Sequence, residues 1–216
     1  MARDFANTSG SPNIDYITYS GVPPVSGLGT VSVAIRLAGD SDCPNYGTII
    51  DITGTGAASG IFLGRNGVGS NLYTAFRNGS TTPLQTFPFT FDGTFRSVVV
   101  TWNGGATPKT VAYVDGVAQT VTGSAGTHTT IGTVADFRIS SPAGFRWNGR
   151  IADLGVYNRV LTADEAAMHA DGAACTQFPR GLICHVNAIR DVHDIAGGRT
   201  PTITGTTVAA HPRIYL

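Results

Sequence analysis

Carboxylate side chains are the first groups in this sequence that could do chemistry, and glutamate is scarce. A typical glycoside hydrolase needs two carboxyl groups that flank the sugar, one protonated and one ionised. The chain has one glutamate, Glu165, three residues after Thr162 in a helix-capping pattern. Asp40 and Asp42 lie in a loop just before Pro44. The sequence therefore predicts no catalytic residues and argues against an enzyme.

Histidines and aspartates gather near the C-terminus, where they raise the question of zinc. The group consists of His185, Asp191, His193 and Asp194. The two histidines are not separated by a standard zinc-ligand spacing. We therefore interpret these side chains as surface polar residues around a turn.

Nucleophilic serines and phosphate-binding loops lack their usual context. The sequence contains no Gly-x-Ser-x-Gly nucleophile motif. The glycine-rich run at residues 64–69 has no lysine and does not begin a helix, so we interpret it as a hairpin loop.

The composition of the 216-residue chain narrows its class. The formal net charge is zero, which argues against nucleic acid as a partner, and 13% of residues are charged. Lys109 is the only lysine, and threonine, valine and glycine are abundant, as in all-β proteins. No apolar run approaches the roughly 20 residues that span a membrane, and no export signal is visible at the start. The three cysteines predict reduced thiols.

Turn residues recur about every 8–12 positions, which predicts a sandwich of short strands. Residues 30–37 alternate between apolar and polar side chains, whereas residues 95–102 are continuously apolar, as in a central strand covered on both faces. Asp115-Gly116 predicts a type I′ hairpin turn, and residues 163–170 predict a helix. Further strands are expected at residues 14–19, 48–53, 61–65, 72–77, 137–140, 147–158, 182–187 and 202–208.

The order of these signals resembles the laminin-G-like branch of the concanavalin A-like jelly-roll superfamily. Residues 92–104 (DGTFRSVVVTWNG) and 111–119 (VAYVDGVAQ) resemble two of its strand motifs. Residues 147–153 (WNGRIAD) and 156–162 (VYNRVLT), followed by Glu165, resemble its closing signature. The resemblance implies an all-β, two-sheet antiparallel sandwich with one short helix.

We expect a sandwich over residues 1–180 and C-terminal strands or an arm over residues 181–216. The arm would pack on the same domain or on a neighbour by strand addition. Its expected anchor is the apolar end of the chain, formed by His211, Pro212, Arg213, Ile214, Tyr215 and Leu216.

The resemblance also implies ligands at the loop rim of the sandwich. Tyr46 and Tyr73, near asparagine- and glycine-rich loops, are candidate glycan contacts together with Asn66 and Asn71. Trp102 and Trp147 are expected in the core. Relatives often hold calcium at a rim, and its oxygen ligands would be Asp40, Asp42, Asp51 and Asp92, although these residues also suit turns.

Three functions remain as alternatives. The first is a structural module on a bacteriophage virion, assembled in the host cytoplasm and bound to other virion proteins, to copies of itself or to cell-surface glycans. The second is a free or secreted lectin, with calcium as a possible cofactor. The third is a glycosidase or lyase, which the carboxylate inventory disfavours.

Overall fold

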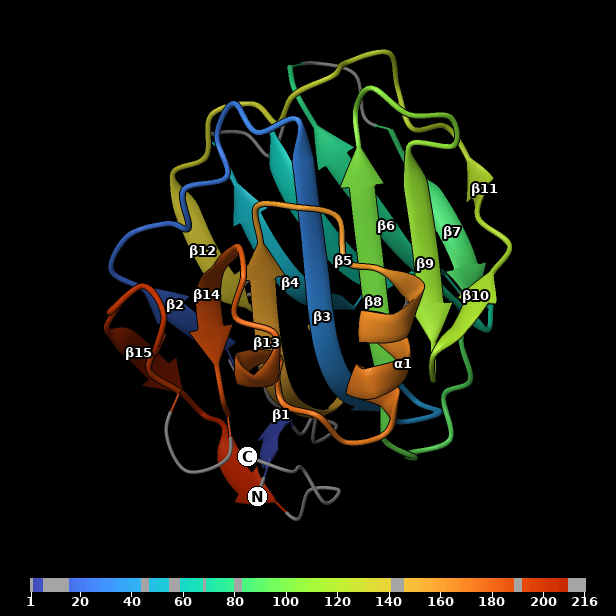
Figure 1. Ribbon diagram of the computed structural model, residues 1–216. Helices are drawn as coiled ribbons and strands as arrows, with labels where there is room; N and C mark the ends of the chain where they lie inside the picture. Colours follow the sequence, from blue (N-terminus) through green and yellow to red (C-terminus); the bar gives the residue numbers. More distant parts are fainter. Residues whose placement is uncertain are drawn as a thin grey trace.

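Two antiparallel sheets packed face to face form the molecule (Figure 1). The computed structural model describes residues 2–5, 16–43, 47–54, 59–67, 69–79, 83–140, 146–188 and 192–209. Sheet A runs in the order β10 (Val117–Gln119), β9 (Thr110–Val114), β8 (Arg96–Asn103), β3 (Thr30–Gly39), β13 (Gly149–Tyr157), β1 (Ala2–Phe5) and β16 (Thr207–Ala209), and β14 (Leu182–Val186) also pairs with β13. Sheet B runs in the order β11 (Thr122–Gly123), β7 (Gln85–Pro88), β6 (Asn71–Arg77), β5 (Gly60–Arg65), β4 (Thr48–Thr53), β12 (Asp136–Ile139), β2 (Tyr16–Tyr19) and β15 (Pro201–Thr204). The predicted all-β sandwich is confirmed.

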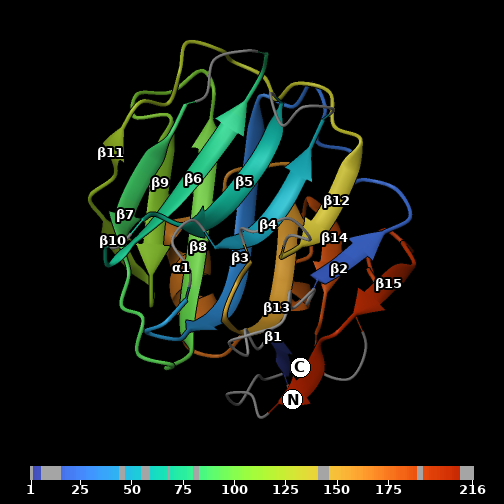
Figure 2. The same cartoon turned by 180° about the vertical axis from the view of Figure 1, so that it is seen from behind.

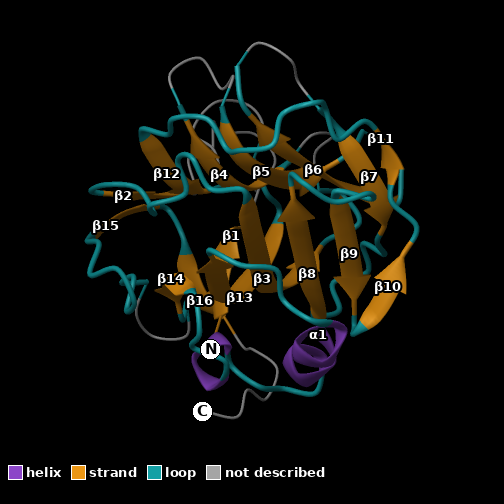
Figure 3. Cartoon of the chain, turned by 45° about the horizontal axis from the view of Figure 1, so that its top comes forward, coloured by secondary structure: helices purple, strands orange, loops and turns teal. Residues whose placement is uncertain are grey.

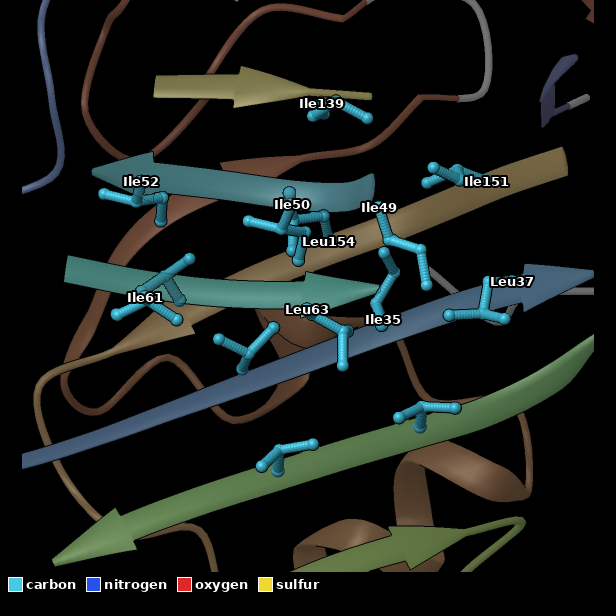
Figure 4. Close-up of a cluster of buried hydrophobic side chains, with 14 of the residues drawn as sticks. Ile35, Leu37, Ile49, Ile50, Ile52, Ile61, Leu63, Ile139, Ile151 and Leu154 are labelled. Carbon is cyan, nitrogen blue, oxygen red and sulfur yellow. The ribbon is translucent and has the colours of Figure 1, made fainter. Parts of the chain in front are cut away.

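The main core fills the space between the sheets (Figure 4). Ile35 and Leu37 of β3 face Ile50 and Leu63 from sheet B, because alternate side chains of each strand point inward. The predicted core positions of the two tryptophans are confirmed, since Trp102 and Trp147 are buried.

A second, smaller core covers the other face of sheet A. The helix α1 (Ala163–Ala170) and the short 3₁₀ helix η2 (Cys175–Gln177) lie against this face (Figure 3). Val99 of β8 is buried there with Tyr157, Ala166 and Phe178. The central strand of sheet A is therefore covered on both faces, as its continuous apolar run predicts.

Local signals define α1 as the sequence predicts. Thr162 is the N-cap, its hydroxyl accepts a hydrogen bond from the Glu165 amide, and the Glu165 carboxylate accepts one from the Thr162 amide. This reciprocal pair satisfies two amides that the helix start would otherwise leave without partners. The hairpin turn is confirmed as well, because Asp115 and Gly116 both have positive φ, 50° and 76°.

The C-terminal strands contribute to both sheets of the same sandwich. The expected strand at residues 202–208 is two strands, separated by a turn in which Gly205 has a φ of 76°. β15 pairs with β2 in sheet B, and β16 pairs with β1 in sheet A. β1 itself was not predicted, because it is only four residues long and its side chains do not alternate between apolar and polar. The predicted anchor at residues 211–216 lies outside the described residues.

Two further expectations concern the membrane and the thiols. Across the described ranges, no helix has both the length and the apolar character to cross a bilayer. Cys43, Cys175 and Cys184 are buried free thiols, which confirms the prediction of reduced cysteines.

Gly104 offers a test of how closely two loops pack at one end of sheet A. A methyl group on Gly104 would lie 2.2 Å from the Thr129 carbonyl oxygen, whereas one on Gly105 would meet only the Asn103 side chain, at 3.6 Å. We expect Gly104→Ala to lower the free energy of unfolding by about 2 kcal/mol, because backbone must move. Urea denaturation measures it, with Gly105→Ala as the control, expected within about 0.5 kcal/mol of the parent. Equal stabilities of the two variants would contradict the close approach.

Candidate functional site

The loop rim at one end of the sandwich is held together by Arg65, at the end of β5. Its guanidinium donates hydrogen bonds to the carbonyl oxygens of Ser41 and Cys43 and lies 4.5 Å from the centre of the Phe91 ring. These contacts join the segments that follow β3 and β5 to the one that precedes β8. Three of the predicted calcium ligands, Asp40, Asp42 and Asp92, lie in these segments.

The four predicted calcium ligands do not come together as one set. Asp42 accepts a hydrogen bond from the Asn148 side chain at 2.8 Å, and Asp92 pairs with Arg96 at 2.9 Å. Asp51 lies in the middle of β4, away from the rim. Among the described residues, the only three acidic, histidine or cysteine side chains close enough to share one ion are elsewhere in the fold. Calcium binding by the rim aspartates stays a prediction, which titration with Ca²⁺ tests.

The predicted glycan contacts are divided between the rim and a sheet face. Asn66 and Asn71 flank the turn between β5 and β6, where the backbone N–H of Asn66 donates a hydrogen bond to the backbone carbonyl oxygen of Asn71 at 3.0 Å. Tyr73 belongs to β6, is 7% exposed, and stacks on Phe62 with ring centres 5.0 Å apart. Tyr46 lies outside the described residues.

Tyr73 belongs to sheet B, whose outer face is turned toward the viewer in Figure 2. No helix of the described chain covers it, because α1 and η2 both lie on sheet A. We call the outward side chains of Asp51, Phe62, Tyr73, Arg77 and Arg138 the sheet-B face.

The sheet-B face combines aromatic rings with charge. The Arg77 guanidinium lies 5.5 Å from the centre of the Phe62 ring, and Asp51 is opposite both Phe62 and Arg138 in the strand register. Burial raises the pKa of Asp51 above its ordinary value, against the opposing influence of Thr53 and Arg138. A ring edged by hydrogen-bonding groups is suited to a ligand with one apolar and one polar side.

Sequence reasoning missed Phe62, which is more exposed than its partner Tyr73. A signal was present, because Ile61 and Leu63 on either side point into the core. The residue between two inward-facing neighbours must point outward, and an aromatic residue there is unusual for a solvated face.

Five ionisable side chains from five segments meet beneath α1, and we call them the Asp153 cluster. Each is at most 5% exposed. They are Arg36 of β3, Asp153 of β13, His169 of α1, Cys175 of η2 and His185 of β14.

A bulge in β13 places Asp153 at the centre of this cluster. The pairing of β13 with β3 shifts register between Ala152 and Gly155, and Asp153 has a φ of 50°. The carboxylate accepts hydrogen bonds from the Cys175 amide at 3.1 Å and from His185 Nε2 at 2.9 Å, and the Nε atom of Arg36 lies 3.9 Å away. One carboxylate thus connects β3, β14 and η2 to β13.

The charges of the cluster depend on one another. Burial opposes ionisation of Asp153, but the neighbouring His169 and His185 side chains outweigh burial and hold the pKa of Asp153 well below its ordinary value. Burial, with help from the Arg36 charge, lowers the pKa of His169. Burial also raises the pKa of the Cys175 thiol strongly. The cluster therefore contains an ionised Asp153 carboxylate paired with Arg36 in the interior.

The interpretation of His185 and Asp194 as surface residues is wrong. His185 is 2% exposed and Asp194 is 1% exposed. Asp194 accepts hydrogen bonds from the His185 amide at 2.8 Å and the Gly197 amide at 3.0 Å, and pairs with Arg199. The turn after Asp194 folds back on β14, and no local pattern marks the distant partner Asp153.

Glu165 is occupied by structural contacts. Arg159 donates to both of its oxygens, at 2.5 and 2.7 Å, at the edge of a pocket of about 360 Å³. The same carboxylate caps α1. The lining residues are Arg159, Thr162, Glu165, Phe178, Pro179 and Arg180.

Comparison with known proteins identifies the family. Residues 13–167 match the model of the concanavalin A-like lectin/glucanases superfamily, in its laminin-G-type branch. The match covers more than half of the sequence and agrees with the two-sheet fold, so the chain belongs to this family. No protein of curated function matches the sequence.

Solved structures with a similar fold are distant in sequence. A Bacteroides ovatus protein assigned as carbohydrate binding superposes with a TM-score of 0.67 at 17% identity, over 95% of this chain and 58% of the other. This chain thus spans little more than half of that protein. The heptameric SAP-like pentraxin of Limulus polyphemus superposes with a TM-score of 0.64 at 17% identity, over 94% of both chains. The binding domain of botulinum neurotoxin DC, in complex with SialylT, superposes with a TM-score of 0.51 at 16% identity, over 66% of this chain and 35% of the other.

Removal of the Asp153 charge tests the buried ion pair. We expect Asp153→Asn to lower the free energy of unfolding by about 3 kcal/mol or more, because Arg36 would stay buried without its counter-charge. Chemical denaturation followed by circular dichroism measures it. Asp136→Asn, which breaks the exposed pair with Arg138, is the control and should cost about 1 kcal/mol or less. Similar losses of unfolding free energy in the two variants would contradict the claim that the buried ion pair stabilises the fold more than an exposed pair does.

Proposed function

We propose that this chain is a non-catalytic module that binds glycans through the sheet-B face. The observation that carries the proposal is the stacked pair of Phe62 and Tyr73 on a face free of helices, with Arg77 beside the Phe62 ring. The C–H side of a sugar ring packs on aromatic faces, and its hydroxyls bond to charged groups at the edge.

Two similar structures support this proposal. The Bacteroides ovatus protein is assigned as carbohydrate binding, and the neurotoxin binding domain was solved with SialylT. Their sequence identities of 17% and 16% are low, so they support the class of ligand rather than its identity.

A substitution of Asp51 distinguishes a binding function from a catalytic one. A carboxyl with raised pKa beside a second carboxyl, here Asp136, is also an arrangement that acid catalysts use. Asp136 pairs with Arg138 at 3.1 Å, which engages it structurally. The proposal expects no release of reducing ends from any bound oligosaccharide; turnover that Asp51→Asn abolishes would establish the glycosidase alternative instead.

Truncation of Phe62 tests the binding face. We expect Phe62→Ala and Arg77→Ala each to weaken the best glycan found on an array by about tenfold or more, through loss of stacking and of a donor. Isothermal titration calorimetry measures the affinity, and thermal unfolding verifies that the variants fold. Val117→Ala, on an exposed strand of sheet A, is the control and should bind as the parent does. Unchanged binding by Phe62→Ala would place the glycan elsewhere.

A place on the surface of a bacteriophage virion is our second proposal. It is supported by one structural feature: among the described residues, β16 is the last strand at one end of sheet A. A strand from a neighbour, either another virion protein or a second copy, can add at such an edge.

Deletion of residues 210–216 tests the second proposal without removing β15 or β16. We expect the shortened chain to keep the melting temperature of the parent and to lose association with particles or with itself. Light scattering coupled to size exclusion, and electron microscopy of particles, measure the association. Deletion of residues 200–216 is the comparison and should destabilise the sandwich, since it removes strands paired with β1 and β2. Unchanged assembly after the shorter deletion would refute the anchor.

A further inference from the structure

The Asp153 cluster contains a set of side chains that suits a transition metal. A carboxylate oxygen of Asp153, Nε2 of His169 and Sγ of Cys175 all lie within 4.8 Å of one another. Asp153 is 1% exposed, and His169 and Cys175 are fully buried. The three residues come from β13, the last turn of α1 and the start of η2, so the fold rather than a local motif assembles them.

One ring nitrogen of the buried His169 has no hydrogen-bond partner. Its Nδ1 lies 2.7 Å from the Ser97 hydroxyl, but its Nε2 makes no hydrogen bond and faces Asp153 Oδ2 at 3.4 Å. A fully buried polar nitrogen without a partner is rare in native proteins. A ligand that accepts the Nε2 lone pair would complete it.

We propose that Asp153, His169 and Cys175 bind a zinc ion. Two ligand atoms bonded to zinc at about 2.0–2.1 Å in a tetrahedron lie about 3.3 Å apart, close to the observed separation of His169 Nε2 from Asp153 Oδ2. One nitrogen, one thiolate sulfur and one carboxylate oxygen favour zinc over calcium or magnesium, which prefer oxygen ligands alone.

The neighbours of the three ligands orient them as outer-shell residues do in zinc sites. With zinc on Nε2, the proton of His169 sits on Nδ1, 2.7 Å from the Ser97 hydroxyl that then accepts it and directs the Nε2 lone pair toward the ion. His185 Nε2 donates to the other carboxylate oxygen, Oδ1, at 2.9 Å, and Oδ2, which accepts from the Cys175 amide at 3.1 Å, keeps a second lone pair for the metal. We assign His185 and Ser97 as positioning residues.

The charge balance accommodates a divalent ion. Binding releases one proton, which leaves the Cys175 thiol for the solvent as the zinc–sulfur bond forms, and the ion with two anionic ligands is neutral. Arg36 remains as a cation, but its guanidinium donates to the carbonyl oxygens of His169 and Ala173 at the C-terminal end of α1. The negative end of the helix dipole adds to the stabilisation that Arg36 receives from Asp153.

The test uses the full chain, refolded with Zn²⁺ or Co²⁺ because the site is buried. After desalting, we expect one equivalent of zinc per chain by mass spectrometry, and a thiolate-to-cobalt charge-transfer absorption with Co²⁺. Cys175→Ala and His169→Ala should lose both signals. Cys184→Ala, which removes an equally buried thiol, is the matched control and should keep both. His185→Gln should keep the absorption and weaken zinc affinity by about 10–100-fold.

Two outcomes would overturn the proposal. One is a folded parent chain that retains no stoichiometric metal and shows no charge-transfer absorption, a result that stands even where a variant fails to fold. The other is a folded Cys175→Ala chain that binds zinc as the parent does. Neither result would bear on glycan binding, because the sheet-B face lies on the opposite sheet.

Discussion

The buried carboxylate of Asp153 is the interaction on which the layout of this molecule depends. A charge in the interior is tolerated only with a counter-charge and a full set of donors. Arg36, His185 and the Cys175 amide supply them, and they come from three separate segments. The same contacts hold the segments around α1, η2 and β14 against sheet A. In the part of the chain that the structure describes, no helix covers the outer face of sheet B.

This asymmetry between the sheets connects the fold to the proposed function. The middle of sheet A is buried on both sides, so its central strands serve stability, as the Val99 and Tyr157 cluster shows. Sheet B is apolar inside and carries Phe62, Arg77 and Asp51 outside. The one glutamate pairs with Arg159 and caps the start of α1, so Glu165 has a structural role. A rigid sheet with a partly aromatic outer face suits recognition of a ligand.

The sequence predicts features that a few adjacent residues determine, and fails where distant segments meet. Thr162 and Glu165 predict the helix, and Asp115-Gly116 predicts the hairpin, because each signal is local. Nearby asparagine- and glycine-rich loops identified Tyr73 as a candidate, but its burial and its partner Phe62 depend on the strand pairing. The Asp153 cluster has no sequence signal, since its members lie up to 149 positions apart, between residues 36 and 185. His185 was misinterpreted for that reason.

The central claim is that the helix-free face of sheet B receives the ligand. The most direct measurement is nuclear magnetic resonance chemical-shift mapping of the labelled chain during titration with a bound oligosaccharide. The account predicts that the largest shifts fall on outward residues of β4, β5 and β6. Shifts concentrated at the α1 surface, or at the rim around residues 40–43 and 66–71, would contradict it.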